Sequence, residues 1–176
     1  LVLHQRSREA RDALKGNEMS AHVGNNSGNN EWYTPERFLT SARHVMGSID
    51  FDPASNDIAQ KTVRAMIYCT KEFSGLDVDW FGRVWMNPPY SAALIKQFAA
   101  KLKQQRAVGN VNEFCVLTNN ATETVWFRDI LSVSDAVCFL NKRVRFLDPD
   151  GNKGDSPLQG QVIFYSGVNL KVFIDE

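Results

Sequence analysis

The sequence predicts an α/β fold in three layers, in which helices cover both faces of a mostly parallel sheet. Short apolar runs of strand length alternate with longer segments of helical period, as expected for such a sheet. The chain closes with two strand-like runs, residues 161–166 and 170–174, which predict an antiparallel hairpin at one edge of the sheet. At 176 residues, with 43% hydrophobic residues, the chain suits one domain with a sizeable core.

The helices and strands follow from local signals. Thr34 suits the N-cap of a first helix, Pro35 suits its first turn, and Gly47 suits its end. Ser91 precedes a second helix, whose apolar residues recur at helical spacing. The uninterrupted apolar run at residues 114–117 is typical of a strand buried on both faces. Further helices are predicted at residues 57–66 and 123–131, and further strands at residues 49–52, 67–69, 83–86 and 136–140.

The N-terminal residues 1–30 differ in composition from the rest. Residues 1–15 are charged and helix-prone, and residues 16–30 contain a polar run rich in Gly, Asn and Ser that has too few apolar side chains to pack. We therefore expect a charged, partly flexible tail and linker over residues 1–30, followed by one domain over residues 31–176.

Composition narrows the function classes. The chain carries 20 basic and 20 acidic residues, so any contact with nucleic acid must come from a local basic patch. The three cysteines are far apart in apolar runs, which predicts buried reduced thiols, and the three histidines do not cluster with carboxylates, so no metal site is predicted. No apolar run is long enough for a membrane span, and no leader pattern is present.

The most informative segment is Asn87-Pro88-Pro89-Tyr90, which follows a predicted strand. Two prolines fix the backbone, remove two amide donors and leave their carbonyl groups free, so the strand must end in a stiff turn. Asp52-Pro53 ends another predicted strand, and the carboxyl ends of parallel strands share one crevice. The segment is thus either a turn that leads into the next helix or a site that holds a planar substrate.

The same four residues match the (Asn/Asp/Ser)-Pro-Pro-(Tyr/Phe/Trp) motif of S-adenosylmethionine-dependent methyltransferases that act on exocyclic amines of DNA. Other segments in the same order strengthen the resemblance. They are Glu31-Trp32-Tyr33-Thr34-Pro35, Asp50-Phe51-Asp52-Pro53-Ala54-Ser55, Tyr68-Cys69-Thr70, and Gly75-Leu76 followed by Trp80. From about residue 31 to residue 173 the chain resembles the phage-type (Dam-like) DNA N6-adenine methyltransferases.

The resemblance implies a Rossmann-like methyltransferase sheet, S-adenosylmethionine as cofactor, double-stranded DNA as partner and no metal. It also implies a phage- or prophage-encoded protein of the bacterial cytoplasm, acting in restriction-modification or regulation. In the motif, the Asn87 oxygen and the Pro88 carbonyl would accept hydrogen bonds from the adenine amine, which is a poor nucleophile because its lone pair is delocalised. Pro89 would keep the turn stiff, and Tyr90 would stack on the flipped base.

The resemblance assigns the cofactor to the first sheet loop and the segment before the first helix. Asp52, Pro53 and Ala54 would contact or order its methionine portion, and Asp77 would contact its adenine amine. The aromatic segment Trp32, Tyr33 and Thr34 would close over a nucleoside face, although Trp32 suits equally well a hydrophobic anchor for the end of the linker. The chain departs from the family at Ser55-Asn56-Asp57, where a Gly-rich loop is usual, and at Ser74, where the family is often acidic.

A local basic patch is predicted near the C-terminal end. Lys142, Arg143, Arg145 and Lys153 flank the Asp148-Pro149-Asp150-Gly151 turn and would contact DNA phosphates. The alternative from the residues alone is an ordinary charged turn, because acidic side chains are interspersed.

Two other functions remain open from the sequence. Methyltransferases that modify a protein glutamine also use Asn-Pro-Pro-Tyr, but they resemble a longer chain with a Gly-rich first loop. The second function is that of a non-catalytic, regulatory DNA-binding domain that kept the methyltransferase fold. The altered loop at Ser55-Asn56-Asp57 favours this function.

Overall fold

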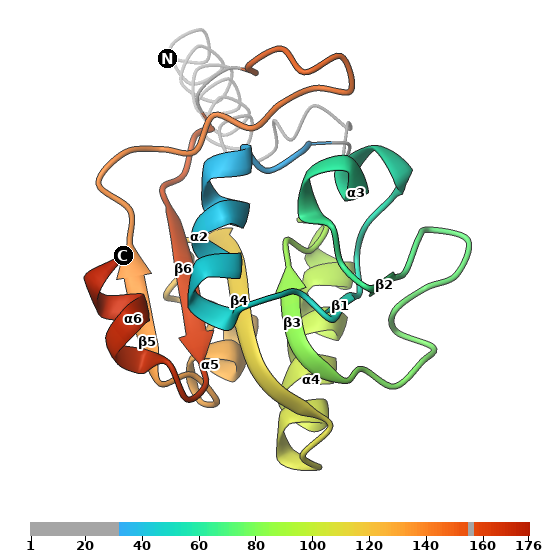
Figure 1. Ribbon diagram of the computed structural model, residues 1–176, viewed down its shortest axis with the longest axis vertical. Helices are drawn as coiled ribbons and strands as arrows, with labels where there is room; N and C mark the ends of the chain where they lie inside the picture. The colour runs from blue at the N-terminus through green and yellow to red at the C-terminus, as the bar shows by residue number, and fades with distance from the viewer. Residues whose placement is uncertain (1–31, 155–156) are drawn as a thin grey trace, which may run out of the picture. The chain divides into compact units, whose positions relative to one another are not determined.

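The computed structural model describes residues 32–154 and 157–176, so the predicted tail and linker over residues 1–30 lie outside the described part of the chain. Figure 1 shows the arrangement of its helices and strands. In chain order these are α2 (Glu36–Met46), β1 (Phe51–Asp52), α3 (Asp57–Val63), β2 (Ile67–Tyr68), β3 (Gly82–Met86), α4 (Ala92–Ala107), β4 (Val111–Asn119), α5 (Val125–Leu131), β5 (Ala136–Phe139), β6 (Gln161–Ser166) and α6 (Leu170–Asp175).

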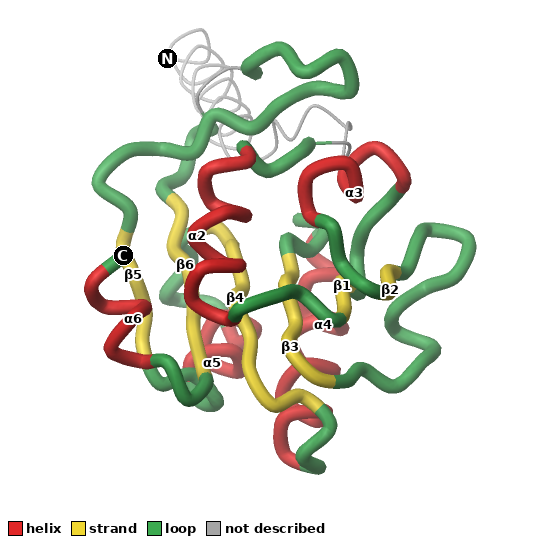
Figure 2. The backbone as a smooth tube through the Cα atoms, in the orientation of Figure 1, coloured by secondary structure: helices red, strands yellow, loops and turns green. Residues whose placement is uncertain are grey.

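The strands form one six-stranded sheet in the order β2-β1-β3-β4-β6-β5. The pairs β1–β2, β1–β3 and β3–β4 are parallel, whereas β6 runs antiparallel to both β4 and β5. The prediction of an α/β fold built on one sheet is therefore confirmed. The loops that follow β1, β3 and β5 leave the sheet at the same end (Figure 2).

The core lies in two layers because neighbouring strand residues point to opposite faces. Val84 and Met86 belong to one buried cluster, and Trp85 between them belongs to the other. Helices α4 and α5 cover the first face, and α2, α3 and α6 cover the second (Figure 1). Burial on both faces accounts for the long apolar run of β4, from Phe114 to Leu117.

The predicted C-terminal hairpin is wrong. β6 forms as expected, but residues 170–175 are the helix α6, and both flanks of β6 are already paired with β4 and β5. Neither edge of β6 is therefore free to pair with a second hairpin strand. α6 instead packs Leu170, Val172 and Phe173 against the second cluster, with the Phe173 ring stacked on Tyr165 at a centroid distance of 4.8 Å.

Several smaller expectations also differ from the structure. Thr34 is not the N-cap of α2, because the helix begins at Glu36 and Pro35 holds the cap position without a side-chain hydrogen bond. The predicted helix over residues 57–66 ends at Val63, since Arg64 adopts a left-handed conformation with φ 55°. Cys138 is exposed on the edge strand β5, whereas the other two cysteines are buried as predicted.

The loop between β2 and β3 is fastened against the turn that follows β1. Gly75 touches Pro53 so closely that a Cβ on Gly75 would lie 2.2 Å from the Pro53 carbonyl oxygen. Trp80, which is 1% exposed, donates a hydrogen bond from Nε1 to the Gly75 carbonyl at 2.7 Å. The predicted Gly75-Leu76 pair thus fixes one loop of the sheet's carboxyl edge to another. Within the described residues no helix is long and apolar enough to cross a membrane.

We expect Gly75→Ala to destabilise the protein by about 2 kcal/mol, because the new methyl group overlaps a backbone oxygen that cannot move freely. Gly160→Ala is the matched control, since a Cβ there meets nothing within 4 Å. Urea unfolding of both variants measures the difference. Equal free energies of unfolding for the two variants would contradict the packing of Gly75 on Pro53.

Candidate functional site

The Asn87 carboxamide is held at both ends beyond the carboxyl end of β3. Its Oδ1 accepts a hydrogen bond from the Tyr90 hydroxyl at 3.0 Å, and its Nδ2 donates to Thr34 Oγ1 at 3.3 Å. Pro88, which follows, is buried, and Pro89 is half-buried. The Asn87 side chain is therefore fixed by Tyr90, three positions later in the chain, and by Thr34, 53 positions earlier.

Tyr90 lies half-buried against the core cluster that α4 covers. Its hydroxyl also lies 3.5 Å from the carbonyl oxygen of Leu117 near the end of β4. Burial raises the pKa of the Tyr90 phenol, so the hydroxyl keeps its proton and remains a donor to Asn87. Ser91 occupies the N-cap position of α4 as predicted, but its side chain makes no cap hydrogen bond.

Residues 32–34 reach this site as a short extended segment. Tyr33 and Leu147 exchange backbone hydrogen bonds, each of 2.9 Å, so the segment pairs with the chain beyond β5. Trp32 packs against the second core cluster and against Gly154, where a Cβ would lie 2.3 Å from the indole ring. This packing agrees with an anchor role for Trp32. Thr34 is buried and presents its hydroxyl to Asn87, which explains why it does not cap α2.

Asp52 is a buried carboxyl group, 2% exposed, at the end of β1. Its Oδ1 accepts a hydrogen bond from the Ala54 amide at 3.2 Å and its Oδ2 accepts one from Gln60 Nε2 at 3.1 Å. Burial raises the pKa of this carboxyl to about 7, and the hydrogen bonds from Ala54, Ser55 and Gln60 oppose the rise. Asp52 thus orders the Pro53-Ala54 turn through its hydrogen bond with the Ala54 amide. With a pKa of about 7, its carboxyl group is partly protonated near neutral pH.

Side chains hold the loop after β1, where the resemblance implies glycines. Asn56 accepts hydrogen bonds from the Ile58 and Ala59 amides as the cap of α3, and its Nδ2 donates to the Tyr33 hydroxyl at 3.2 Å. Gln60 donates to Ser55 Oγ at 2.8 Å. Asp77 is exposed on the loop that Gly75 fastens to Pro53. The structure therefore gathers Thr34, Asp52, Asn56 and Asn87 at one edge of the sheet through hydrogen bonds and strand pairing.

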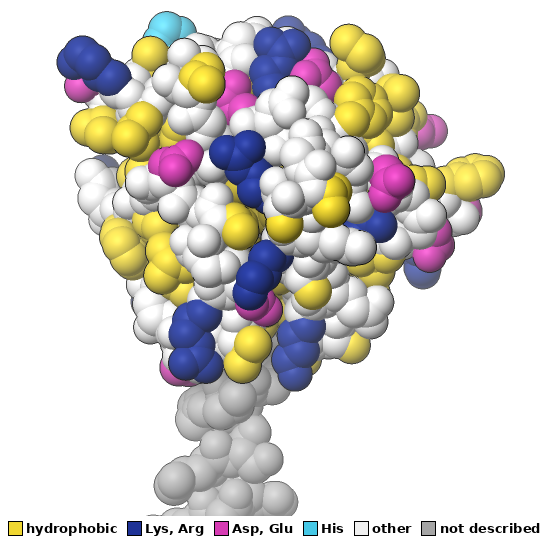
Figure 3. Space-filling view, turned by 90° about the horizontal axis from the view of Figure 1, so that it is seen from below, with side chains coloured by type: hydrophobic (Ala, Val, Ile, Leu, Met, Phe, Trp, Pro, Cys, Tyr) yellow, Lys and Arg dark blue, Asp and Glu magenta, His cyan; other side chains and the backbone are white. Residues whose placement is uncertain are grey.

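A basic concavity lies beside this edge. It has a volume of about 650 Å³ and is lined by Pro35, Arg37, Lys142, Arg143, Arg145 and Lys153. All four predicted phosphate-binding residues are brought together there, and no acidic residue among residues 32–154 and 157–176 lines the space. Figure 3 shows the opposite end of the molecule, where basic and acidic side chains are mixed. We call the space lined by Pro35, Arg37, Lys142, Arg143, Arg145 and Lys153 the basic concavity.

The geometry of the loop explains the gathering of charge. Val144 and Phe146 are buried in the second cluster, so the alternating Arg143 and Arg145 point outward. Asp148 turns inward, where its Oδ1 accepts hydrogen bonds from the amides of residues 150 and 152 at 3.0 and 2.8 Å. Its carboxylate is therefore engaged within the turn and does not line the concavity.

Arg37 is the cation that sequence reasoning missed. It projects from the first turn of α2, with its guanidinium 4.6 Å from the centroid of the Phe38 ring. Arg37 lies far from Lys142 in the sequence, so the sequence does not reveal their proximity. The pairing of Tyr33 with Leu147 and the packing of Trp32 on Gly154 bring the two segments together. Among the described residues there is no group of three or more His, Cys, Asp or Glu side chains that could hold a metal ion.

Comparison with protein families supplies the classification. The family model described as DNA N-6-adenine-methyltransferase (Dam) matches residues 22–168. This chain belongs to the Dam family. The predicted resemblance is thereby confirmed, and the matched span includes every residue from Thr34 to Lys153 discussed above. Comparison with curated proteins finds no match.

We expect the stability of this Dam family member to fall as pH rises from about 4 to about 7. The folded-state pKa of Asp52 is about 7, above the ordinary value of 3.8, so the folded state binds more protons across this window. The contribution approaches about 1.4 kcal/mol per pH unit at its steepest. Asp52→Asn should remove this slope, whereas Asp77→Asn, at an exposed position, should not.

Urea unfolding at pH 5 and pH 7 measures the slope for the parent and both variants. An unchanged slope in Asp52→Asn would show that another group controls the pH dependence.

Proposed function

We propose that this protein is a DNA adenine-N6 methyltransferase that transfers a methyl group from S-adenosylmethionine to the exocyclic amine of a flipped adenine. The observation that carries the proposal is the Asn87 carboxamide, fixed between the Tyr90 and Thr34 hydroxyls at the carboxyl edge of the sheet. Membership of the Dam family supports the reaction class and favours DNA over a protein glutamine as substrate.

The Asn87 oxygen is suited to polarise an amine. A carboxamide oxygen has two lone pairs, so it can accept from Tyr90 and from one adenine N–H at the same time. The Thr34 hydroxyl holds Nδ2, which keeps the oxygen end of the amide in place. The Pro88 carbonyl in the stiff turn would accept the second N–H. Two such acceptors oppose delocalisation of the amine lone pair and favour its attack on a methyl group.

Tyr90 has two roles in this proposal. Its hydroxyl orients Asn87, and its ring stacks on the base that has left the helix. Because the hydroxyl keeps its proton, the orientation of the amide is maintained over the working pH range. Pro89 restricts the backbone between the two functional side chains.

The residues around Asp52 fit the cofactor. S-adenosylmethionine supplies an electrophilic methyl group on a sulfonium sulfur and carries an ammonium group on its methionine portion. The buried Asp52 carboxyl, with its raised pKa, gains from a nearby cation, which would favour its charged form. Pro53 and Ala54 form the turn that Asp52 orders, and Asp77 lies on the adjoining loop. Trp32, Tyr33 and Thr34 border the same edge of the sheet and would close one side of the cofactor site.

The basic concavity supplies the DNA contact in this proposal. Lys142, Arg143, Arg145 and Lys153 would neutralise phosphates, with Arg37 as a fifth cation. Pro35 lines the concavity one residue from Thr34, which bonds Asn87. A duplex held there would therefore present its bases near the Asn87 turn. Because the chain has a formal net charge of zero, its contact with DNA phosphates must come from a local group of cations such as this one.

A non-catalytic DNA-binding role is the second candidate. The observation that favours it is the loop after β1, where Ser55 and Asn56 use their side chains for internal hydrogen bonds with Gln60 and Tyr33. Calorimetry with S-adenosylmethionine separates the two functions. A stoichiometric complex supports the enzyme, and the absence of binding supports the regulatory domain.

We expect Asn87→Ala to lower methyl transfer to DNA by about 10²- to 10³-fold, because it removes one acceptor for the amine. Binding of S-adenosylmethionine should be largely kept. Transfer of labelled methyl groups to genomic DNA, followed by mapping of N6-methyladenine, measures the effect and identifies the base and its sequence context.

Asn87→Asp is the matched control, since it keeps acceptor oxygens and belongs to the family motif, so it should retain more activity than Asn87→Ala. Equal methylation by the parent and Asn87→Ala would exclude the proposed mechanism.

We also expect Arg145→Ala and Lys153→Ala to weaken DNA binding for all sequences alike. Each should reduce the slope of log affinity against log salt by about 1, because one phosphate contact is lost. Lys171→Ala is the control, since Lys171 pairs with Asp175 on α6 at 3.2 Å and does not line the basic concavity. Fluorescence anisotropy at several salt concentrations measures the slopes, and identical slopes for parent and variants would exclude the concavity as the DNA site.

A further inference from the structure

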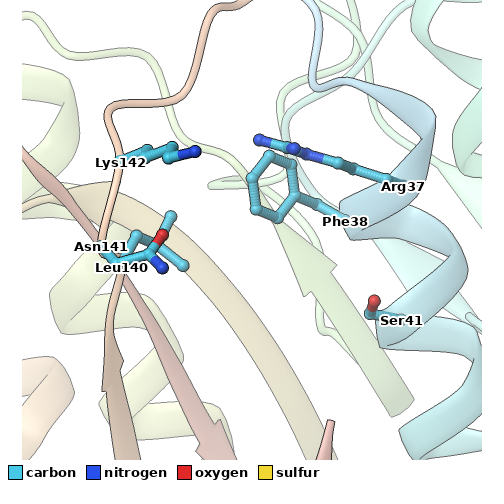
Figure 4. A pocket seen from close by; sticks show the side chains of 6 residues that line it. All are labelled: Arg37, Phe38, Ser41, Leu140, Asn141 and Lys142. Carbon is cyan, nitrogen blue, oxygen red and sulfur yellow. The ribbon is translucent and has the colours of Figure 1, made fainter.

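A second pocket opens between α2 and the chain that leaves β5. It has a volume of about 350 Å³, which lies at the lower end of the range for small-ligand sites of about 300–1,000 Å³. Figure 4 shows the residues that line it: Arg37, Phe38, Ser41, Leu140, Asn141 and Lys142. We call it the side pocket. Neither Asn87 nor Tyr90 lines it, so it is distinct from the catalytic turn.

The side pocket adjoins the basic concavity. Arg37 and Lys142 line both spaces. In Figure 4 the Arg37 and Phe38 side chains extend from α2 toward Lys142 on the facing segment. A phosphate bound by these two cations in the basic concavity would therefore hold its own nucleotide at the mouth of the side pocket.

The lining combines three kinds of group. Phe38 and Leu140 offer apolar surface, including one aromatic ring, and Arg37 and Lys142 offer positive charge. Ser41 and Asn141 offer both donors and acceptors, and none of the described residues that line the space is acidic. A ligand that matches all three has a flat apolar body, a negative charge and an edge that forms hydrogen bonds. A nucleotide has this combination, whereas a cation or an uncharged sugar does not.

We propose that the side pocket binds one unpaired nucleotide of the DNA, other than the target adenine. This inference rests on the proposed DNA substrate. The base takes the place of the Arg37 guanidinium over the Phe38 ring, beside Leu140. Its edge meets Asn141 and Ser41, and the displaced Arg37 side chain binds the phosphate together with Lys142. Extrusion of the target adenine leaves neighbouring bases or the opposite base without full stacking and pairing, and such a base costs less to move than one in an intact duplex.

The first test compares the binding of three duplexes by the full-length protein, and the duplexes share the same paired sequence. One is fully paired, one has a single unpaired nucleotide, and one has an abasic residue at the unpaired position. We expect the unpaired nucleotide to bind at least tenfold more tightly than the abasic residue, since a stacked base contributes on the order of tenfold or more. Equal affinity for these two duplexes would overturn the inference.

Substitutions in the side pocket test whether the preference for the unpaired nucleotide arises there. Phe38→Leu keeps apolar volume but removes the ring, so the preference should be lost, whereas Phe38→Tyr should retain it. Phe38 packs against the second core cluster, and thermal unfolding of Phe38→Leu verifies the fold. Asn141→Ala, at an exposed position, should reduce discrimination among the four unpaired bases without any effect on the core. Unchanged preference in Phe38→Leu would overturn the inference.

Two further experiments distinguish binding in the side pocket from binding at the Asn87 turn and from binding of a free nucleotide. Asn87→Ala should keep the preference, and its loss in that variant alone would place the unpaired base at the catalytic turn instead. Free deoxynucleoside monophosphates should compete only weakly, and competition stronger than that of the unpaired duplex would assign the side pocket to a free nucleotide.

The methyl-transfer assay distinguishes this inference from the proposed activity. Methyl transfer without a preference for the unpaired nucleotide overturns the side pocket alone. A preference that depends on Phe38, without methyl transfer, supports the side pocket and excludes the catalytic function. The absence of any DNA binding would overturn the side pocket and the DNA substrate together.

Discussion

The hydrogen bond from Asn87 Nδ2 to Thr34 Oγ1 joins two parts of the candidate site that lie far apart in the sequence. Thr34 lies just before α2 and belongs to the segment that pairs with Leu147, whereas Asn87 follows β3. Through Thr34, the Asn87-Pro88-Pro89-Tyr90 turn is coupled to the basic loop beyond β5. A displacement of residues 32–34 would therefore disturb both the orientation of the Asn87 amide and the position of the cations.

Much of the fold and of the motif was predictable from local sequence. Strand positions followed from apolar runs, and the Asn87 turn was recognisable because two prolines leave few alternatives for the backbone. The arrangement around β6 was not, since residues 170–174 alternate well enough to suggest a strand and only the pairing of both flanks of β6 excludes one. Local signals describe a segment, but they do not reveal which edges of a strand are already occupied.

The site illustrates the same limit. The cluster of Lys142, Arg143 and Arg145 was visible because its members are neighbours in sequence, whereas Arg37 joins them only through tertiary structure. Thr34 was singled out for a cap that it does not provide, and its hydroxyl serves Asn87 instead. At the loop after β1, where the resemblance implies glycines, polar side chains form hydrogen bonds that hold the loop. This loop is thus fixed in place without glycines.

The position of β6 between β4 and β5 also governs how the chain can fold during synthesis. β5 is hydrogen-bonded within the sheet only to β6, which follows it after a connection of more than 20 residues. Until residue 166 has left the ribosome, β5 has no partner, and the exposed flank of β4 remains an unpaired edge. Strands β1 to β4 can associate before then, whereas the basic loop between β5 and β6 is fixed at both ends only when β6 inserts. The basic loop is therefore ordered late, and a nascent chain released before β6 retains an open edge that favours aggregation.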